Sequence, residues 1–67
     1  MAKHLERNSR KLLKLLEGDG WRVVRVSGSH HTLKKAGMKF PVVLVHPKKD
    51  LPLGLVHKIY KDAGWFP

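Results

Sequence analysis

The N-terminal third of the chain carries the pattern of one amphipathic helix. Leucines at positions 12, 13, 15 and 16 fall on one broad helical face, with charged residues between and beside them. Ser9 suits the N-cap position, and Gly18 can take the left-handed conformation that ends a helix. The pattern therefore predicts a helix over residues 9–17, preceded by a loose basic leader over residues 1–8.

Three extended segments follow. Residues Trp21–Val26 are aromatic and β-branched, which is typical of a strand. After a break at residues 27–29, His30–Lys35 can pair back as a second strand, and Phe40–Val45 is a further β-branched apolar run. We expect the large side chains that begin the first and third segments, Trp21 and Phe40, to lie in the core.

The C-terminal part predicts a second helix after an irregular basic loop. The loop, His46–Pro52, contains two prolines and three charged residues. Apolar residues then recur at helical spacing from Leu55 to Ala63, with Gly64 just past the end. The order is α-β-β-β-α, an α+β fold. We expect one domain over residues 9–67, with two helices packed on one face of a three-stranded antiparallel sheet.

Composition limits what so small a domain can do. A chain of 67 residues has too small a core to enclose a bulky cofactor, and none is expected. Its 14 Lys and Arg against 5 Asp and Glu give a formal charge of +9. Such a charge favours a polyanionic partner: nucleic acid, an anionic membrane surface or an acidic protein. No apolar run approaches a membrane span of roughly 18 residues, so no membrane partner is expected. The absence of Cys suits a reducing cytoplasm, which is the expected location.

Histidine is the candidate residue type for chemistry. Histidines occur at positions 4, 30, 31, 46 and 57, but no pair has the i, i+4 helical spacing of a zinc motif, so no metal site is expected. Gly28-Ser29-His30-His31 falls at the break between two predicted strands, where glycine permits close approach of a backbone or a phosphate. Four lysines could hold a phosphodiester against this segment: Lys34, Lys35, Lys48 and Lys49.

One imidazole with lysines is about the minimum apparatus for cleaving RNA without a metal, because RNA carries its own nucleophile, the 2′-hydroxyl. The protein needs only to bind the backbone, move a proton and stabilise charge on the phosphate. Strand alternation puts His30 on a polar face with Lys34, whereas His31 shares the side of Leu33. We therefore predict His30 as the general acid or base, with Gly28, Ser29 and His31 in support. The second catalytic group stays open among Ser29, Lys34, Lys35 and His46.

The same residues carry a family resemblance. Gly28-Ser29-His30-His31 after Asp19–Val26, the His46–Pro52 loop and Ile59–Gly64 together resemble the HicA toxins of HicAB toxin–antitoxin systems. The resemblance runs from about residue 9 to residue 64. It implies a fold like the double-stranded-RNA-binding domain and the activity of an mRNA interferase, a ribosome-independent ribonuclease. The family's catalytic histidine maps onto His30 and its glycine onto Gly28.

The resemblance also implies a partner, the HicB antitoxin, which covers the active surface. Toxin and antitoxin together repress their own operon, so DNA would be contacted only indirectly, through that complex. Two other classes of function remain as alternatives. One is a non-catalytic RNA-binding module of the same fold, and the other is a small interaction subunit whose charge docks an acidic protein.

Overall fold

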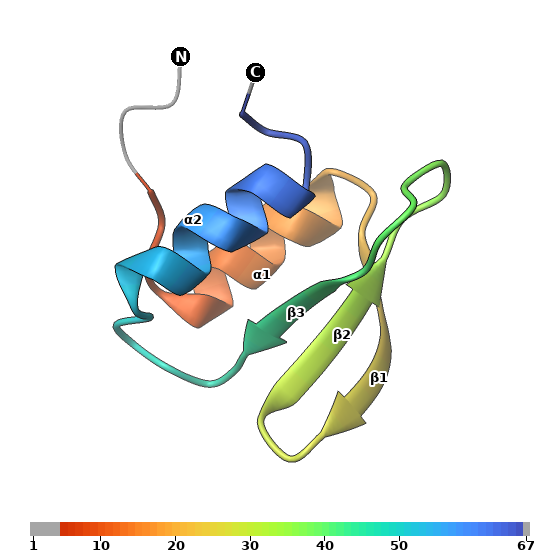
Figure 1. Ribbon diagram of the computed structural model, residues 1–67. Helices are drawn as coiled ribbons and strands as arrows, with labels where there is room; N and C mark the ends of the chain where they lie inside the picture. Colours follow the sequence, from red (N-terminus) through yellow and green to blue (C-terminus); the bar gives the residue numbers. More distant parts are fainter. Residues whose placement is uncertain (1–4, 67) are drawn as a thin grey trace.

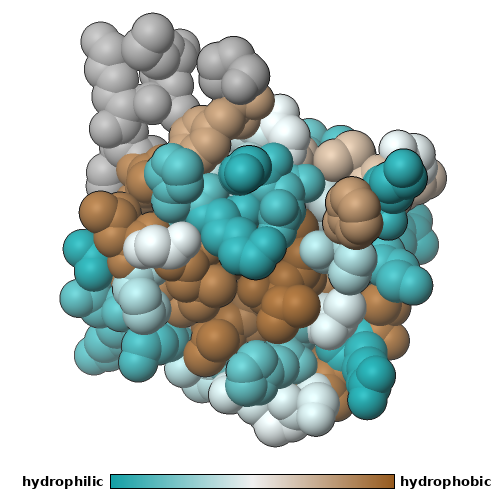
Figure 2. Space-filling view, in the orientation of Figure 1, coloured by the Kyte–Doolittle hydropathy of each residue, from teal (hydrophilic) through white to brown (hydrophobic). Residues whose placement is uncertain are grey.

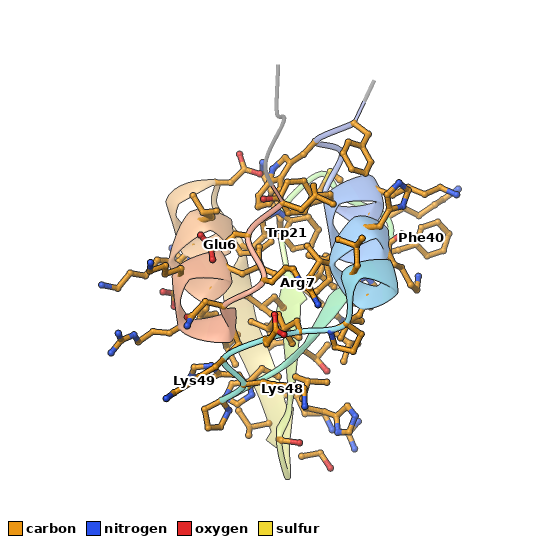
Figure 3. The ribbon with its side chains drawn as sticks, turned by 90° about the vertical axis from the view of Figure 1, so that its left-hand side faces the viewer. Glu6, Arg7, Trp21, Phe40, Lys48 and Lys49 are labelled. Carbon is orange, nitrogen blue, oxygen red and sulfur yellow. The ribbon has the colours of Figure 1, made fainter. Side chains whose placement is uncertain are left out.

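The computed structural model describes residues 5–66 and confirms the predicted α-β-β-β-α order (Figure 1). The elements are α1 (Ser9–Gly18), β1 (Arg22–Ser27), β2 (His30–Lys34), β3 (Val42–Val45) and α2 (Leu53–Asp62). The strands form one antiparallel sheet in the order β1-β2-β3. The two helices lie side by side in one layer, with the sheet behind them in Figure 3. Neither helix is long and apolar enough to cross a membrane, within the part of the chain that the structure describes.

The core lies between the helices and the two strands β2 and β3. Its fully buried side chains come from every layer: Leu12, Leu16, Trp21, Leu33, Val42, Leu44, Leu51, Val56 and Ile59. Trp21 is 1% exposed and lies between the two helices, as expected (Figure 3). The expectation for Phe40 is wrong. That side chain is 69% exposed and points away from the body of the molecule (Figure 3). Residues 39–41 form a bend rather than a strand, because Pro41 has no N–H to donate to a ladder.

The N-cap of helix α1 lies one residue earlier than expected. The N-cap is Asn8, whose side-chain oxygen accepts a hydrogen bond from the backbone N–H of Lys11 at 3.1 Å. The prediction of Ser9 as the N-cap is therefore wrong. Ser9 lies inside the helix and is 1% exposed. Its hydroxyl bonds to residues of the loop after β3 instead, so it joins two segments that are distant in sequence.

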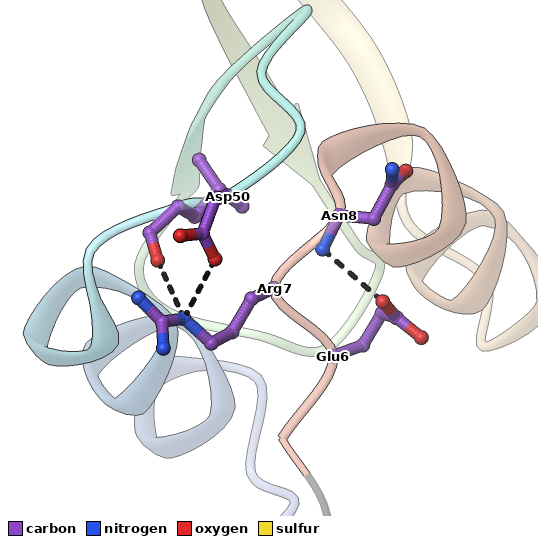
Figure 4. A network of polar contacts seen from close by, with 5 residues as sticks. Glu6, Arg7, Asn8 and Asp50 are labelled. Atoms are coloured by element: carbon purple, nitrogen blue, oxygen red, sulfur yellow. Dashed lines mark hydrogen bonds and ion pairs between the residues drawn. The ribbon is translucent and has the colours of Figure 1, made fainter.

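Residues 5–8, which we call the N-terminal strap, run between α1 and α2 in the view of Figure 3. Leu5 packs against the core, and the N–H of Glu6 donates to the Tyr60 hydroxyl at 3.0 Å. The Arg7 side chain donates to the Leu51 carbonyl at 2.9 Å and pairs with a neighbouring carboxylate at 3.3 Å (Figure 4). The expected loose leader is therefore anchored over residues 5–8. Its remainder, residues 1–4, lies outside the described residues, as does Pro67.

Asp19, just after α1, links residues that lie before β1, after β2 and after α2. One of its carboxylate oxygens accepts hydrogen bonds from the indole N–H groups of Trp65 at 2.9 Å and Trp21 at 3.3 Å. The same oxygen pairs with the Lys35 ammonium at 3.2 Å. These partners favour the charged form, and the hydrogen bond from Trp65 contributes most to holding the pKa of Asp19 below its usual value.

Candidate active site and basic surface

The site is built on the two-residue turn between β1 and β2. Ser27 and His30 are paired across the hairpin, so Gly28 and Ser29 form the turn. Gly28 has a φ of +59°, the left-handed conformation expected at the first position of a type II′ turn. A Cβ at Gly28 would meet no atom within 4 Å, so glycine is needed for the backbone conformation and not for space. His30 directly follows this turn and is the first residue of β2.

The two adjacent histidines point to opposite faces of the sheet, as strand alternation predicts. His30 is exposed, on the face of the sheet that it shares with Lys34; we call this the open face, and its β3 edge borders α2. His31 is half-buried and is paired with Leu44, a core residue. The His31 ring meets the His46 ring edge-on, with centroids 5.1 Å apart and an interplanar angle of 83°.

The turn is fixed to the rest of the fold through His46, which follows β3. The backbone N–H of His46 donates to the Ser29 carbonyl at 2.8 Å. Its ring Nδ1 lies 2.7 Å from the Ser9 hydroxyl, and that hydroxyl also accepts the backbone N–H of Lys48 at 2.7 Å. The Ser9 N–H in turn donates to the Lys48 carbonyl at 2.9 Å. The start of α1, the basic loop and the turn are thus held together at one end of the sheet.

The two lysines of β2 and its end have different surroundings. Lys34 is exposed on the open face, four residues from His30 and thus about 13 Å away along the strand. Lys35 lies one residue beyond β2 and pairs with Asp19, with 30% of its side chain exposed. The structure therefore does not bring Lys35 to the turn, and it holds its ammonium against a carboxylate at the other end of the strand.

The two lysines of the loop after β3 lie on the same end of the sheet as the turn. Lys48 and Lys49 are exposed and border a pocket of about 390 Å³ at the start of α1. Arg10 and His46 also line this pocket, so its wall carries several cationic or titratable side chains. In Figure 3 both lysines project from the loop at the bottom of the view.

Two arginines that the sequence analysis did not single out join the open face. Arg25 is paired with Thr32 and Arg22 with Lys34, and both arginines are exposed. Residues three apart in a regular strand point to opposite faces. A β-bulge between residues 23 and 25 adds one residue to β1 and returns Arg25 to the side of Arg22. We call Arg22, Arg25 and Lys34 the basic band.

Side chains that could ligate a metal ion are not clustered in the described part of the chain. Over residues 5–66, no group of three or more His, Cys, Asp or Glu side chains is close enough to hold a metal ion. The three described histidines near the turn are divided between the two faces of the sheet, with no carboxylate among their hydrogen-bond partners in the described chain.

Comparison with protein families gives a match over most of the chain. A family model described as the HicA toxin of bacterial toxin–antitoxin systems matches residues 9–65. A sequence search of curated proteins finds no match. The matched segment runs from the first residue of α1 to Trp65 and contains the whole turn, the basic band and the loop after β3.

Proposed function

The chain belongs to the HicA toxin family, and from that premise we propose that it is an endoribonuclease that cleaves messenger RNA without a metal ion, with His30 as a general acid or base. The family consists of toxins of toxin–antitoxin systems, and its members are generally ribonucleases. The proposal adds the substrate, the mechanism and the residue that moves the proton.

The proposed reaction is a transesterification within the RNA backbone. The 2′-oxygen of one nucleotide forms a bond to the adjacent phosphorus while the bond from phosphorus to the 5′-oxygen breaks. A base takes the proton from the 2′-hydroxyl, and an acid gives a proton to the departing 5′-oxygen. The products are a 2′,3′-cyclic phosphate and a 5′-hydroxyl. Cations near the phosphate offset the charge that builds up on its oxygens.

One observation carries the proposal: His30 is exposed at the anchored hairpin turn, on the face of the sheet that bears the basic band. An imidazole titrates near neutral pH and can therefore move a proton under cellular conditions. The basic band supplies positive charge along the same face, and the pocket beside Lys48 and Lys49 supplies more at the adjoining end. Phosphate contacts of this kind hold a backbone without reading its sequence.

Geometry also bears on the second catalytic group. Ser29 is adjacent to His30, and His46 donates its backbone N–H to the Ser29 carbonyl. Lys34 is about 13 Å along the strand, and Lys35 is occupied by Asp19. These placements disfavour the two lysines as the partner of His30 in proton transfer. Ser29 is adjacent to His30, whereas the His46 ring is held by the Ser9 hydroxyl and lies against the His31 ring, which is on the other face of the sheet.

A growth assay tests the role of His30. Expression of the wild-type chain should arrest growth and degrade transcripts, and His30→Ala should abolish both effects. His57→Ala is the matched control, because His57 is an exposed histidine on α2 and should leave toxicity unchanged. Persistent arrest and degradation by His30→Ala would show that His30 is not the catalytic group. RNA binding without cleavage by the wild-type chain would favour the non-catalytic RNA-binding module.

We further propose that the antitoxin partner is a HicB-type protein that covers this surface and that toxin and antitoxin act together in the cytoplasm. The family supplies the general expectation of an antitoxin, and the charge of +9 favours an acidic covering surface. Contact with DNA would then occur through the complex. Co-expression with the product of the neighbouring reading frame should give a stable complex that suppresses cleavage, whereas independent purification of both proteins with full activity would contradict the proposal.

A further inference from the structure

A small pocket opens beside His30, between the sheet and α2. Its volume is about 200 Å³. Five apolar side chains line it: Pro41, Val43 and Val45 from β3 and its approach, and Leu55 and Ile59 from α2. Figure 2 shows hydrophobic surface across the junction of α2 and β3, bordered by hydrophilic residues. His30 also lines this pocket.

The pocket also has one positive and one negative side chain. Lys58 and Asp62 lie one helical turn apart on α2, with 2.8 Å between the ammonium nitrogen and a carboxylate oxygen. Asp62 is 27% exposed and Lys58 is 70% exposed. Together they offer a hydrogen-bond donor and an acceptor at the rim of an otherwise apolar cavity. This combination of apolar walls with a few polar groups is typical of small-ligand sites.

We propose that this pocket binds one unpaired nucleobase of the RNA, from a nucleotide that flanks the phosphate at His30. The inference rests on the proposed ribonuclease function, since that function brings an RNA backbone to His30. The apolar side chains contact the base, and Lys58 and Asp62 bond to the donors and acceptors on its edge. The pocket is smaller than the roughly 300–1,000 Å³ of drug-sized ligand sites, which suits a single base and no more.

The proposal has a consequence for the form of the substrate. A base can enter the pocket only when it is unstacked and unpaired, as in single strands and loops. The domain should therefore cleave single-stranded RNA in preference to a duplex, although the family resemblance implies a fold like the double-stranded-RNA-binding domain, which recognises duplexes by shape. The pocket, together with Lys58 and Asp62, would also give the enzyme a preference among bases at one position.

Binding can be tested without cleavage. We would titrate the wild-type chain with each of the four nucleoside 3′-monophosphates, and separately with inorganic phosphate, and follow backbone amide signals by NMR. Val43→Phe fills the pocket from an exposed strand position, with Val43 itself 43% exposed. Leu53→Phe, at a position that is 53% exposed at the start of α2 and outside the pocket, is the control. Thermal melts of both variants would establish that each is folded.

The expected result is that the nucleotides shift the signals of Val43, Leu55 and Ile59. Val43→Phe should weaken nucleotide binding about tenfold, in line with the loss of one base contact, while phosphate binding stays unchanged. Leu53→Phe should behave as wild type. Asp62→Asn should change the order of affinity among the four nucleotides, because it replaces an acceptor-only group by an amide that also donates.

Cleavage assays with single-stranded and duplex RNA of one sequence separate the two proposals. The base pocket would be overturned if Val43→Phe and Leu53→Phe were equal in binding, base preference and cleavage. Metal-free cleavage by the wild-type chain would then leave the ribonuclease proposal standing. Nucleotide binding that is lost in Val43→Phe, without cleavage of any RNA, would support the pocket and overturn the ribonuclease proposal. Equal affinity for nucleotides and inorganic phosphate would also overturn the base pocket.

Discussion

The hydroxyl of Ser9 is the clearest single link between α1 and the loop that carries the basic pocket. It is buried to 1% exposure and makes two short contacts, 2.7 Å to His46 Nδ1 and 2.7 Å from the N–H of Lys48. Ser9→Ala removes both contacts and leaves two polar groups without their partner. A buried group that loses its partner costs about 1–3 kcal/mol. Lys48 is exposed and His46 is half-buried, so water restores part of the loss.

We therefore expect Ser9→Ala to lower the free energy of unfolding by about 2 kcal/mol, which is one such penalty rather than two. For a domain of this size the change corresponds to a fall in Tm of about 8–16 °C. Urea denaturation and a thermal melt measure the two quantities. The backbone hydrogen bond from the Ser9 N–H to the Lys48 carbonyl, at 2.9 Å, remains available in the variant.

Ser27→Ala is the matched control for this measurement, because Ser27 is an exposed serine at the end of β1. Its effect on the free energy of unfolding should lie within about 0.5 kcal/mol. If Ser9→Ala were no less stable than Ser27→Ala, the hydroxyl would not join helix and loop as described. Hydrogen exchange at the Lys48 amide gives a local check, since its protection should fall in Ser9→Ala and persist in Ser27→Ala.

Three further changes test other parts of the account. The lowered pKa of Asp19, caused first by the Trp65 hydrogen bond, means that its carboxylate stabilises the fold at neutral pH. That contribution should disappear as the pH falls below about 4. The free energy of unfolding of Asp19→Asn, measured by urea melts, should therefore fall less steeply in acid than that of the wild type. An unchanged pH dependence would refute the assignment. Replacing Arg22 and Arg25 together by Gln should weaken binding to single-stranded RNA and reduce its salt slope by about 1.4, whereas an unaltered slope would remove both from the interface. Gly28→Ala should cost about 1–2 kcal/mol of stability, measured in urea, because its φ is +59° in the turn, and a neutral effect would contradict that strain.

The elements of this fold follow closely from local patterns in the sequence. Helical spacing places Leu12 and Leu16 on the apolar face of α1, and both are buried, although Leu15 on the same predicted face is 49% exposed. β-branched runs identify β1 and β3, and the break at residues 27–29 identifies β2 as the strand that pairs back. Alternation along β2 assigns His30 and His31 to opposite faces from sequence alone. These inferences succeed because each depends on neighbours a few residues apart.

The errors have a different origin, since each concerns a feature that the whole fold decides. Ser9 has the chemistry of an N-cap, but Asn8 takes that position because the Ser9 hydroxyl is held by the loop after β3. Phe40 is exposed because Pro41 delays the start of β3. An apolar run alone does not show where pairing begins.

The candidate site was only partly accessible from the sequence for the same reason. The sequence analysis identified the turn and its first histidine, but the bulge that brings Arg25 to the side of Arg22 leaves no signal in a pattern of alternating residues. Lys35 is adjacent to Lys34 in sequence, yet Asp19 holds it at the far end of the strand. The pocket between β3 and α2 depends on how the helix packs beside the strand, which no local pattern specifies.

The central claim is that His30 moves a proton during metal-free cleavage of RNA. The most direct measurement incubates purified protein with a labelled single-stranded RNA in excess EDTA and identifies the new ends by mass spectrometry. The account predicts a 2′,3′-cyclic phosphate and a 5′-hydroxyl from the wild-type chain, and loss of these products in His30→Ala while its thermal melt stays unchanged. Cleavage by His30→Ala at the wild-type rate, or wild-type cleavage that stops when EDTA is added, would contradict it.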